Sequence, residues 1–149
     1  NSNQILLNGN DVSRRIRETE VSEFVSEVSA VSIVREKMVN LQREIAAGNN
    51  VVLEGRDIGT RVFPNADFKF YLNADVKVRG KRRYKELVSR GEIITLNQVI
   101  KKIELRDLKD STRKHSPLEK AKNSIEIDTS NMSIKTQVEK IVSLINNNK

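Results

Sequence analysis

The chain has 149 residues and a formal net charge of +7, with 37% hydrophobic and only 4% aromatic residues. This length suits one domain, and the composition predicts a core of Val, Ile and Leu. The absence of cysteine excludes disulfides, thiolate metal sites and a cysteine nucleophile, and it suits a reducing compartment. No apolar run is long enough to span a bilayer, and the start does not read as a signal peptide. The basic excess favours phosphate-rich partners, either nucleotides or nucleic acid.

The start of the chain is unusual. It begins at Asn1 without a methionine, in a short predicted strand over residues 4–7. Asn8-Gly9 is typical of two-residue hairpin turns, but we expect no first partner strand before it. Asp11 is placed to cap a short basic turn over residues 12–17. These features predict the interior of a longer protein.

Helices and strands alternate through the rest of the chain. Thr19, Ser32 and Thr95 are expected to cap helices, and Gly48 and Gly91 to end them. Helices are predicted over residues 20–30, 33–47, 75–89, 96–110 and 134–145, the first two from apolar residues at helical spacing. Strands are predicted over residues 51–54, 68–72 and 124–128. This alternation indicates an α/β fold with a parallel sheet.

The most informative stretch is a loop that follows the apolar run Val51-Val52-Leu53. It reads Glu54-Gly55-Arg56-Asp57-Ile58-Gly59-Thr60, followed by Arg61-Val62-Phe63-Pro64. Open α/β sheets bind ligands where strands emerge in this way. Two glycines allow the backbone to approach a ligand closely, and adjacent opposite charges stand between them.

A second group of charges ends the predicted helix over residues 96–110. Arg106, Asp110 and Arg113 are separated by four and three residues, which places them on one helical face. The arginine fork suits phosphate oxygens, and an aspartate between two arginines can orient them or accept hydrogen bonds from a base or sugar. From this spacing alone, the alternative to a binding site is a solvent-exposed helix face that carries an ion pair.

Three segments resemble bacterial cytidylate kinases. The loop resembles their GRD-x-GT-x-VFP pattern. Residues 104–118, which end in Pro117-Leu118, resemble their ERD…D…R…PL segment, and residues 8–21 resemble NG-x-DV-x…IR…EV. The chain departs from the family at Val31-Ser32, where a proline often stands nearby. The similarity runs from Asn8 to Ile145 and implies a P-loop-type nucleoside monophosphate kinase core, a parallel sheet flanked by helices, with an arginine-rich helical lid.

The resemblance also implies a pocket for CMP or dCMP. Its residues would be Ser26, Arg35, Arg56, Asp57, Arg106, Asp110 and Arg113. The two aspartates would serve base and sugar recognition, while the arginines hold the α-phosphate. Lid arginines would neutralise the transferring phosphoryl group, namely Arg79, Arg82, Arg83 and Arg90. The catalytic residues would be Arg56, Arg82, Arg83 and Arg113.

By the same resemblance the chain divides into three regions. Residues 1–34 would belong to the CMP-binding insert, residues 35–74 and 117–149 to the α/β core, and residues 75–116 to the lid and the CMP-binding helix. The full-length protein is expected to be a cytoplasmic, monomeric (d)CMP kinase that converts CMP or dCMP to CDP or dCDP. ATP would be the phosphoryl donor, and Mg²⁺ would be bound through ATP.

A phosphoryl-transfer enzyme of this kind needs G-x-x-x-x-G-K-[ST], whose amides and lysine hold the donor phosphates. The sequence contains no such motif, and the stretch from Gly55 to Thr60 lacks the lysine. We therefore expect the C-terminal two-thirds of a cytidylate kinase, lacking the N-terminal strand and P-loop and inactive alone with ATP. Beside strands 51–54 and 68–72 we expect an exposed apolar groove, or direct pairing of the two.

One alternative is a non-catalytic nucleotide- or nucleic-acid-binding remnant of a kinase. Against nucleic acid stand the 20 acidic residues interspersed among the 27 basic ones and the scarcity of aromatics for stacking bases. We expect neither a nucleic-acid nor a membrane partner. His115 is the only histidine, and it is assigned no role because it lacks catalytic partners.

Overall fold

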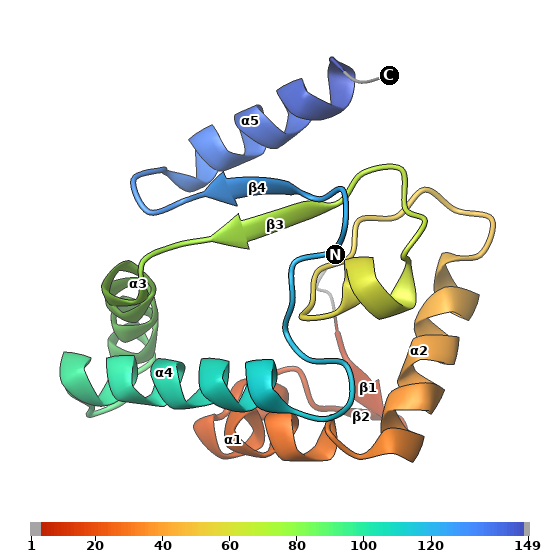
Figure 1. Ribbon diagram of the computed structural model, residues 1–149. Helices are drawn as coiled ribbons and strands as arrows, with labels where there is room; N and C mark the ends of the chain where they lie inside the picture. Colours follow the sequence, from red (N-terminus) through yellow and green to blue (C-terminus); the bar gives the residue numbers. More distant parts are fainter. Residues whose placement is uncertain (1–3, 148–149) are drawn as a thin grey trace.

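The computed structural model describes residues 4–147, apart from the side chains of Glu23 and Ser26 (Figure 1). The strand expected over residues 4–7 is present only at Leu6–Leu7. The helices and strands, in chain order, are β1 (Leu6–Leu7), β2 (Asn10–Asp11), α1 (Thr19–Val28), α2 (Ser32–Ala46), β3 (Phe70–Asn73), α3 (Val76–Ser89), α4 (Leu96–Thr112), β4 (Ile125–Asp128) and α5 (Ile134–Asn146). A 3₁₀ turn covers Arg15–Arg17, and a π-helical turn covers Ile58–Val62.

The central sheet consists of the parallel strands β3 and β4, and α5 lies beside it (Figure 1). Phe70 pairs with Ile125 and Asn73 with Asp128, so the two strands run in register over their whole length. The expected α/β class with a parallel pair is confirmed for these strands. The most deeply buried side chains, Ile127, Val62 and Val99, are aliphatic, as the composition predicts.

The strand expected over residues 51–54 is wrong. The chain there is extended, but in the described part of the molecule it pairs with no strand, and β3 pairs only with β4. Val52 is fully exposed, and Val51 and Leu53 are also exposed. Backbone polar groups need a neighbouring strand to form a ladder, so an apolar run without one stays irregular. Among the described residues, the segment 51–54 does not pair directly with β3. The expected exposure of apolar side chains is present, and it includes Leu72 of β3.

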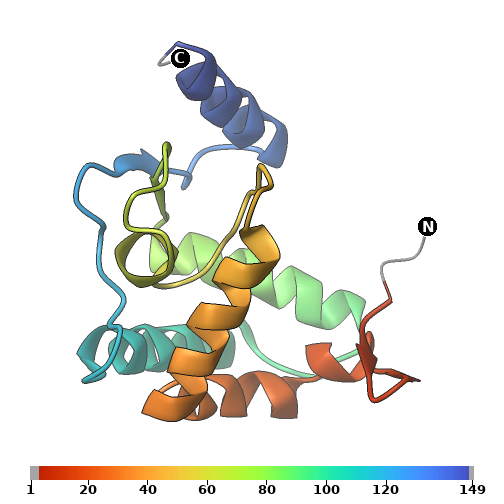
Figure 2. The same cartoon turned by 90° about the vertical axis from the view of Figure 1, so that its right-hand side faces the viewer.

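The N-terminal segment forms a hairpin, which corrects the expectation that Asn8-Gly9 has no first partner strand. Leu6 pairs with Asp11 and Leu7 with Asn10. Asn8 and Gly9 have φ angles of 51° and 82°, the left-handed conformation that a type I′ hairpin turn requires. The hairpin extends away from the rest of the molecule in Figure 2.

Helix ends follow the predicted capping residues in part. Thr95 caps α4 in a full capping box with Gln98, and Gly48 and Gly91 adopt positive φ after α2 and α3, as predicted. The expected caps at Thr19 and Ser32 are wrong. Each is instead the first residue of its helix. The Thr19 hydroxyl donates to the Glu92 carboxylate, and the Ser32 hydroxyl donates to the Glu36 carboxylate.

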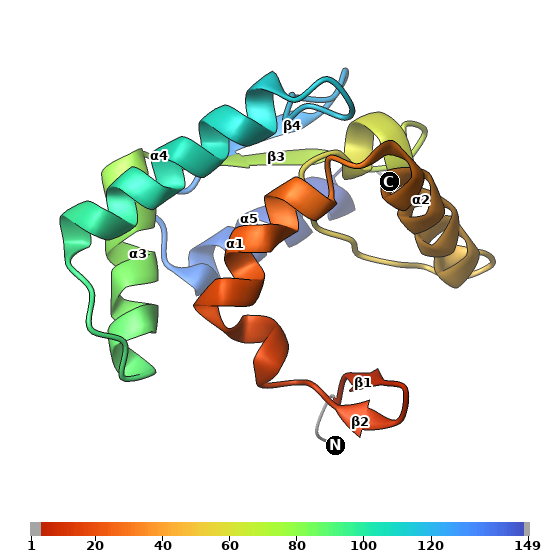
Figure 3. The same ribbon diagram turned by 90° about the horizontal axis from the view of Figure 1, so that it is seen from below.

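Helices α3 and α4 form a hairpin that α1 follows along one side (Figure 3). Gly80 of α3 and Val99 of α4 are buried where the two helices cross. A Cβ atom built on Gly80 would lie 2.4 Å from Cγ1 of Ile100. The close approach of the two helices therefore depends on a residue without a side chain at this position.

Replacing Gly80 with alanine is expected to destabilise the protein by about 1 kcal/mol, since overpacking costs ~1–3 kcal/mol and outweighs the gain in helix propensity of about 1 kcal/mol. Urea unfolding measures this. Ile100→Ala removes the clashing Cγ1 atom, so the double variant should be less destabilised than the sum of the two single variants. Additive losses would contradict the proposed contact.

Apolar side chains remain exposed along several helices, α2 and α5 among them. Their exposed members are Ile33, Met38, Leu41 and Ile45 of α2, and Ile134, Val138 and Val142 of α5. The helical spacing of α2 was read correctly, but the described residues leave its apolar face uncovered. Within residues 4–147, no helix combines the length and apolar character needed to cross a membrane.

Candidate functional site

The loop after residue 54 folds into a π-helical turn that begins at Asp57. The carbonyl oxygen of Asp57 accepts hydrogen bonds from the backbone N–H groups of Arg61 at 2.8 Å and of Val62 at 3.3 Å. Arg43 of α2 donates from Nε to the Val62 carbonyl at 2.9 Å and from Nη2 to the Arg61 carbonyl at 2.8 Å. The turn is thereby attached to α2, and the carboxylate of Asp57 is held at its start.

Gly55 allows this loop to fold back on itself. A Cβ atom on Gly55 would lie 2.9 Å from Cγ1 of Ile58, which is closer than real contacts of that kind. The first glycine of the motif therefore serves close packing within the loop.

Asp57 forms a buried ion pair with Arg35 of α2. The Asp57 side chain is 4% exposed and its Oδ2 atom contacts Nη2 of Arg35. The pair joins the loop to the helix across 22 positions of sequence. Nε of Arg35 is buried, and no hydrogen-bond acceptor reaches it among the described residues.

Asp110 lies at the centre of three arginines. It is buried near the C-terminal end of α4, with Oδ2 at 3.2 Å from Nε of Arg56 and at 3.8 Å from Nε of Arg106, while Oδ1 lies 3.7 Å from Nη1 of Arg113. The backbone carbonyl of Asp110 accepts a hydrogen bond of 2.7 Å from the N–H group of Leu118. The spacing of four and three residues thus forms one cluster, as the sequence predicts, and the cluster is joined by the loop arginine.

Arg113 is the most buried arginine of this cluster. It follows the last residue of α4, its side chain is 8% exposed, and Nε donates to the carbonyl of Ser116 at 2.5 Å. Ser116 has a φ of 52°, so the chain turns sharply around the guanidinium. Nη2 of Arg113 is buried and meets no acceptor in the described part of the chain. A buried charged donor without an acceptor is costly, so this nitrogen would gain from an anionic acceptor.

These groups surround a hollow of about 160 Å³, here named the arginine pocket. Four arginines and three carboxylates line it, so the lining carries one excess positive charge. Its lining residues are Val25, Ser29, Arg35, Gln42, Glu54, Gly55, Arg56, Asp57, Ile58, Arg106, Asp110 and Arg113. The volume and charge suit a compact anion such as a phosphate group with part of the molecule that carries it.

Six of the seven residues expected from the resemblance line this pocket together. They are Arg35, Arg56, Asp57, Arg106, Asp110 and Arg113. The side chain of the seventh, Ser26, lies outside the described residues. Gln42 and Glu54 also line the pocket, although the sequence reading gave them no role. Gln42 stands seven residues after Arg35, two helical turns along the same face, which is the signal that could have found it.

The expected lid arginines do not line the pocket and contact other groups. Arg79 donates from Nη1 to Asp107 at 2.5 Å, and Arg82 donates from Nη2 to the carbonyl of Thr129 at 2.5 Å. Arg83 donates to Glu86 at 2.7 Å. Arg79 therefore joins α3 to α4 and Arg82 joins α3 to the end of β4, whereas the Arg83 contact lies within α3.

Metal ligands are scarce in the described ranges. Within residues 4–147, no three side chains of His, Cys, Asp or Glu gather closely enough to hold a metal ion. Two carboxylates of the arginine pocket, Asp57 and Asp110, are paired with guanidinium groups instead.

The fold places an arginine-lined hollow at the loop that follows residue 54 in a chain with a parallel α/β sheet. Comparison with known proteins gives the family, because a family model described as cytidylate kinase matches residues 1–147. This chain belongs to the cytidylate kinase family.

Individual relatives agree with this assignment. A protein named cytidylate kinase from Pediococcus pentosaceus is 46% identical over 144 residues, which cover 97% of this chain and 64% of the relative. A cytidylate kinase from Cytophaga hutchinsonii is 50% identical over 138 residues, which cover 93% of this chain and 59% of the relative. A cytidylate kinase from Fusobacterium nucleatum is 51% identical over 128 residues, which cover 86% of this chain and 59% of the relative. The chain thus spans about 60% of the length of these curated relatives.

Proposed function

We propose that the arginine pocket is the phosphoryl-acceptor site of a kinase that transfers the γ-phosphate of ATP to CMP or dCMP. The observation that carries this proposal is a pair of buried guanidinium nitrogens, Nε of Arg35 and Nη2 of Arg113, that have no acceptor among the described residues. Both belong to arginines that line the same hollow. A phosphate oxygen would supply the acceptor that each nitrogen needs.

In this proposal the arginines and aspartates have separate tasks. Arg56, Arg106 and Arg113 hold the α-phosphate, and Asp110 keeps their guanidinium groups oriented through the contacts described above. The carboxylates of Asp57 and Asp110 accept hydrogen bonds from the cytosine amino group and the sugar. Such positioning is the main protein contribution to phosphoryl transfer, because little acid–base chemistry is required.

The lid arginines would act on the phosphoryl group during its transfer. Arg82 and Arg83 would exchange their contacts with Thr129 and Glu86 for contacts with the transferring phosphoryl group when the lid closes. ATP would be the donor, with Mg²⁺ carried on its phosphates. The described residues offer no carboxylate cluster for that ion, and none of the tasks assigned here depends on one.

The expected specificity follows from the acidic groups in the pocket. UMP presents a carbonyl oxygen where CMP presents an amino group, and a pocket carboxylate facing that oxygen would lose its donor. The intact kinase should therefore phosphorylate CMP and dCMP at least tenfold more efficiently than UMP or AMP, a difference of about 1.4 kcal/mol or more. Steady-state kinetics with the four acceptors measures this. Equal kcat/KM for UMP would refute the assignment of the aspartates, and no turnover of any acceptor would favour a non-catalytic binding protein.

A further inference from the structure

Helix α1 forms one wall of the arginine pocket, and much of its apolar surface is open to solvent. It contributes Val25 and Ser29 to the lining. Its apolar side chains Phe24, Val25 and Val28 are exposed. Since burial of apolar surface is the usual force that fixes a helix, the position of α1 must depend strongly on its polar contacts.

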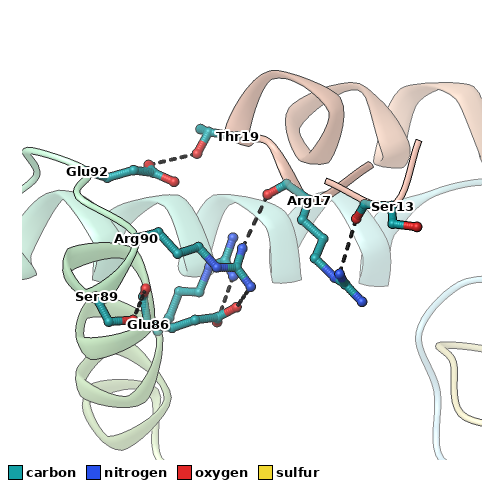
Figure 4. A network of polar contacts seen from close by, with 8 residues as sticks. Ser13, Arg17, Thr19, Glu86, Ser89, Arg90 and Glu92 are labelled. Carbon is teal, nitrogen blue, oxygen red and sulfur yellow. Dashed lines mark hydrogen bonds and ion pairs between the residues drawn. The ribbon is translucent and has the colours of Figure 1, made fainter. Parts of the chain in front are cut away.

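The N-terminal end of α1 is joined to the connection between α3 and α4 by a group of polar contacts, here named the α1 bridge (Figure 4). Thr19 donates its hydroxyl to Oε2 of Glu92 at 2.8 Å, across 73 positions of sequence. Arg90 donates from Nη1 to the backbone carbonyl of Arg17 at 3.3 Å. Both contacts are made by residues at the turn that follows α3.

Glu86 of α3 orients Arg90, one of the donors of the α1 bridge. This carboxylate accepts 2.5 Å and 2.7 Å hydrogen bonds from Arg90 and Arg83, respectively. The hydrogen bond from Arg83, together with the positive charges of both arginines, lowers the pKa of Glu86, so the carboxylate stays ionised and continues to orient Arg90 near neutral pH. Arg90 is thus oriented toward the backbone carbonyl of Arg17.

The C-terminal half of α1 has a weaker contact with the same helical hairpin. Lys109 of α4 lies 3.4 Å from Glu27, and both side chains are 62% exposed. Ion pairs in water contribute little, so this contact cannot replace the bridge. Helix α4 meanwhile supplies Arg106 and Asp110 to the opposite wall of the pocket. The bridge therefore links α1, which forms one wall, to the helical hairpin that supplies the other wall.

We propose that Thr19 and Glu92 are positioning residues that hold α1 against the α3–α4 hairpin and so set the width of the acceptor pocket. The same contact makes the turn after α3 and the wall of the pocket move together. The inference rests on the proposed function for the identity of the ligand, but the contact itself is independent of it.

The test uses a matched pair of substitutions in this chain. Thr19→Val removes the hydroxyl at nearly constant volume, and Thr19→Ser keeps it. Thr19→Val should weaken CMP binding about threefold to tenfold in calorimetric titration, since hydrogen bonds to charged groups are the stronger ones. Thr19→Ser should bind as the wild type does, and so should Lys109→Gln, because Lys109 makes only the exposed contact. Affinity for inorganic phosphate should stay unchanged in all three, because the arginines are untouched.

Amide hydrogen exchange without any ligand separates this inference from the proposed function. Thr19→Val should increase exchange in α1 while leaving α4 protected, and Thr19→Ser should restore protection. Unchanged exchange in α1 and unchanged CMP affinity in Thr19→Val would overturn the inference, as would an equal loss in Thr19→Ser. If the wild type bound phosphate but not CMP, the proposed function would fall, and the exchange result would still decide the role of the bridge.

Discussion

Replacing Arg113 with alanine is expected to weaken CMP binding by at least tenfold. The substitution removes the most buried guanidinium of the arginine pocket, including the Nη2 atom that meets no acceptor among the described residues. A charge-assisted hydrogen bond is worth about 1.5–3 kcal/mol, which corresponds to a loss of roughly tenfold or more in affinity. Calorimetric titration of the variant with CMP measures the loss, and in the intact kinase the Michaelis constant for ATP should change much less.

Two further substitutions serve as comparison and control. Arg56→Ala should also weaken CMP binding by at least tenfold, since Arg56 reaches the pocket from the loop and contacts Asp110 at 3.2 Å. His115→Ala should bind like the wild type, because His115 is exposed and lies outside the lining. A folded but inactive His115→Ala variant would show that the site has been placed wrongly.

Replacing Asp110 with asparagine is expected to destabilise the fold by about 3 kcal/mol. The carboxylate is buried and neutralises three arginines, so the isosteric amide would leave their positive charges facing one another without compensation. Breaking a buried ion pair by removing one partner typically costs about 3–5 kcal/mol, and the partial exposure of two of the arginines favours the lower value. Urea unfolding gives the change in the free energy of unfolding.

Asp107 provides a matched control on the same helix, one turn earlier. Among the described residues its ion pair is with Arg79, and its side chain is 28% exposed. Asp107→Asn should therefore cost about 1 kcal/mol or less. Equal losses for the two variants would contradict the central position that Asp110 has in the arginine cluster.

The sequence predicted well what depends on local spacing. The separation of Arg106, Asp110 and Arg113 was sufficient to place them on one face, and the capping box at Thr95 and the left-handed glycines marked helix ends correctly. The parallel pairing of β3 with β4 followed from the alternation of strands with helices. Each of these features is determined within a few residues or by a general rule of connection.

Features that depend on distant partners were harder to predict. The apolar run Val51-Val52-Leu53 has the composition of a buried strand, but a strand requires a neighbour to pair with, and the described residues provide none. Threonine is a residue type that often caps helices, but the hydroxyl of Thr19 donates to Glu92 instead. The resemblance placed Arg35 and Asp57 in one pocket but did not predict their ion pair, since no local pattern links a helix to a loop 22 residues later.

The central claim is that the arginine pocket binds CMP and discriminates it from UMP. Calorimetric titration of this chain with CMP, UMP and inorganic phosphate tests it most directly. We expect one saturable site for CMP, displacement of CMP by phosphate, at least tenfold weaker binding of UMP, and loss of the CMP signal in Arg113→Ala. Binding of UMP as tight as that of CMP, or CMP binding that Arg113→Ala leaves unchanged, would contradict the account.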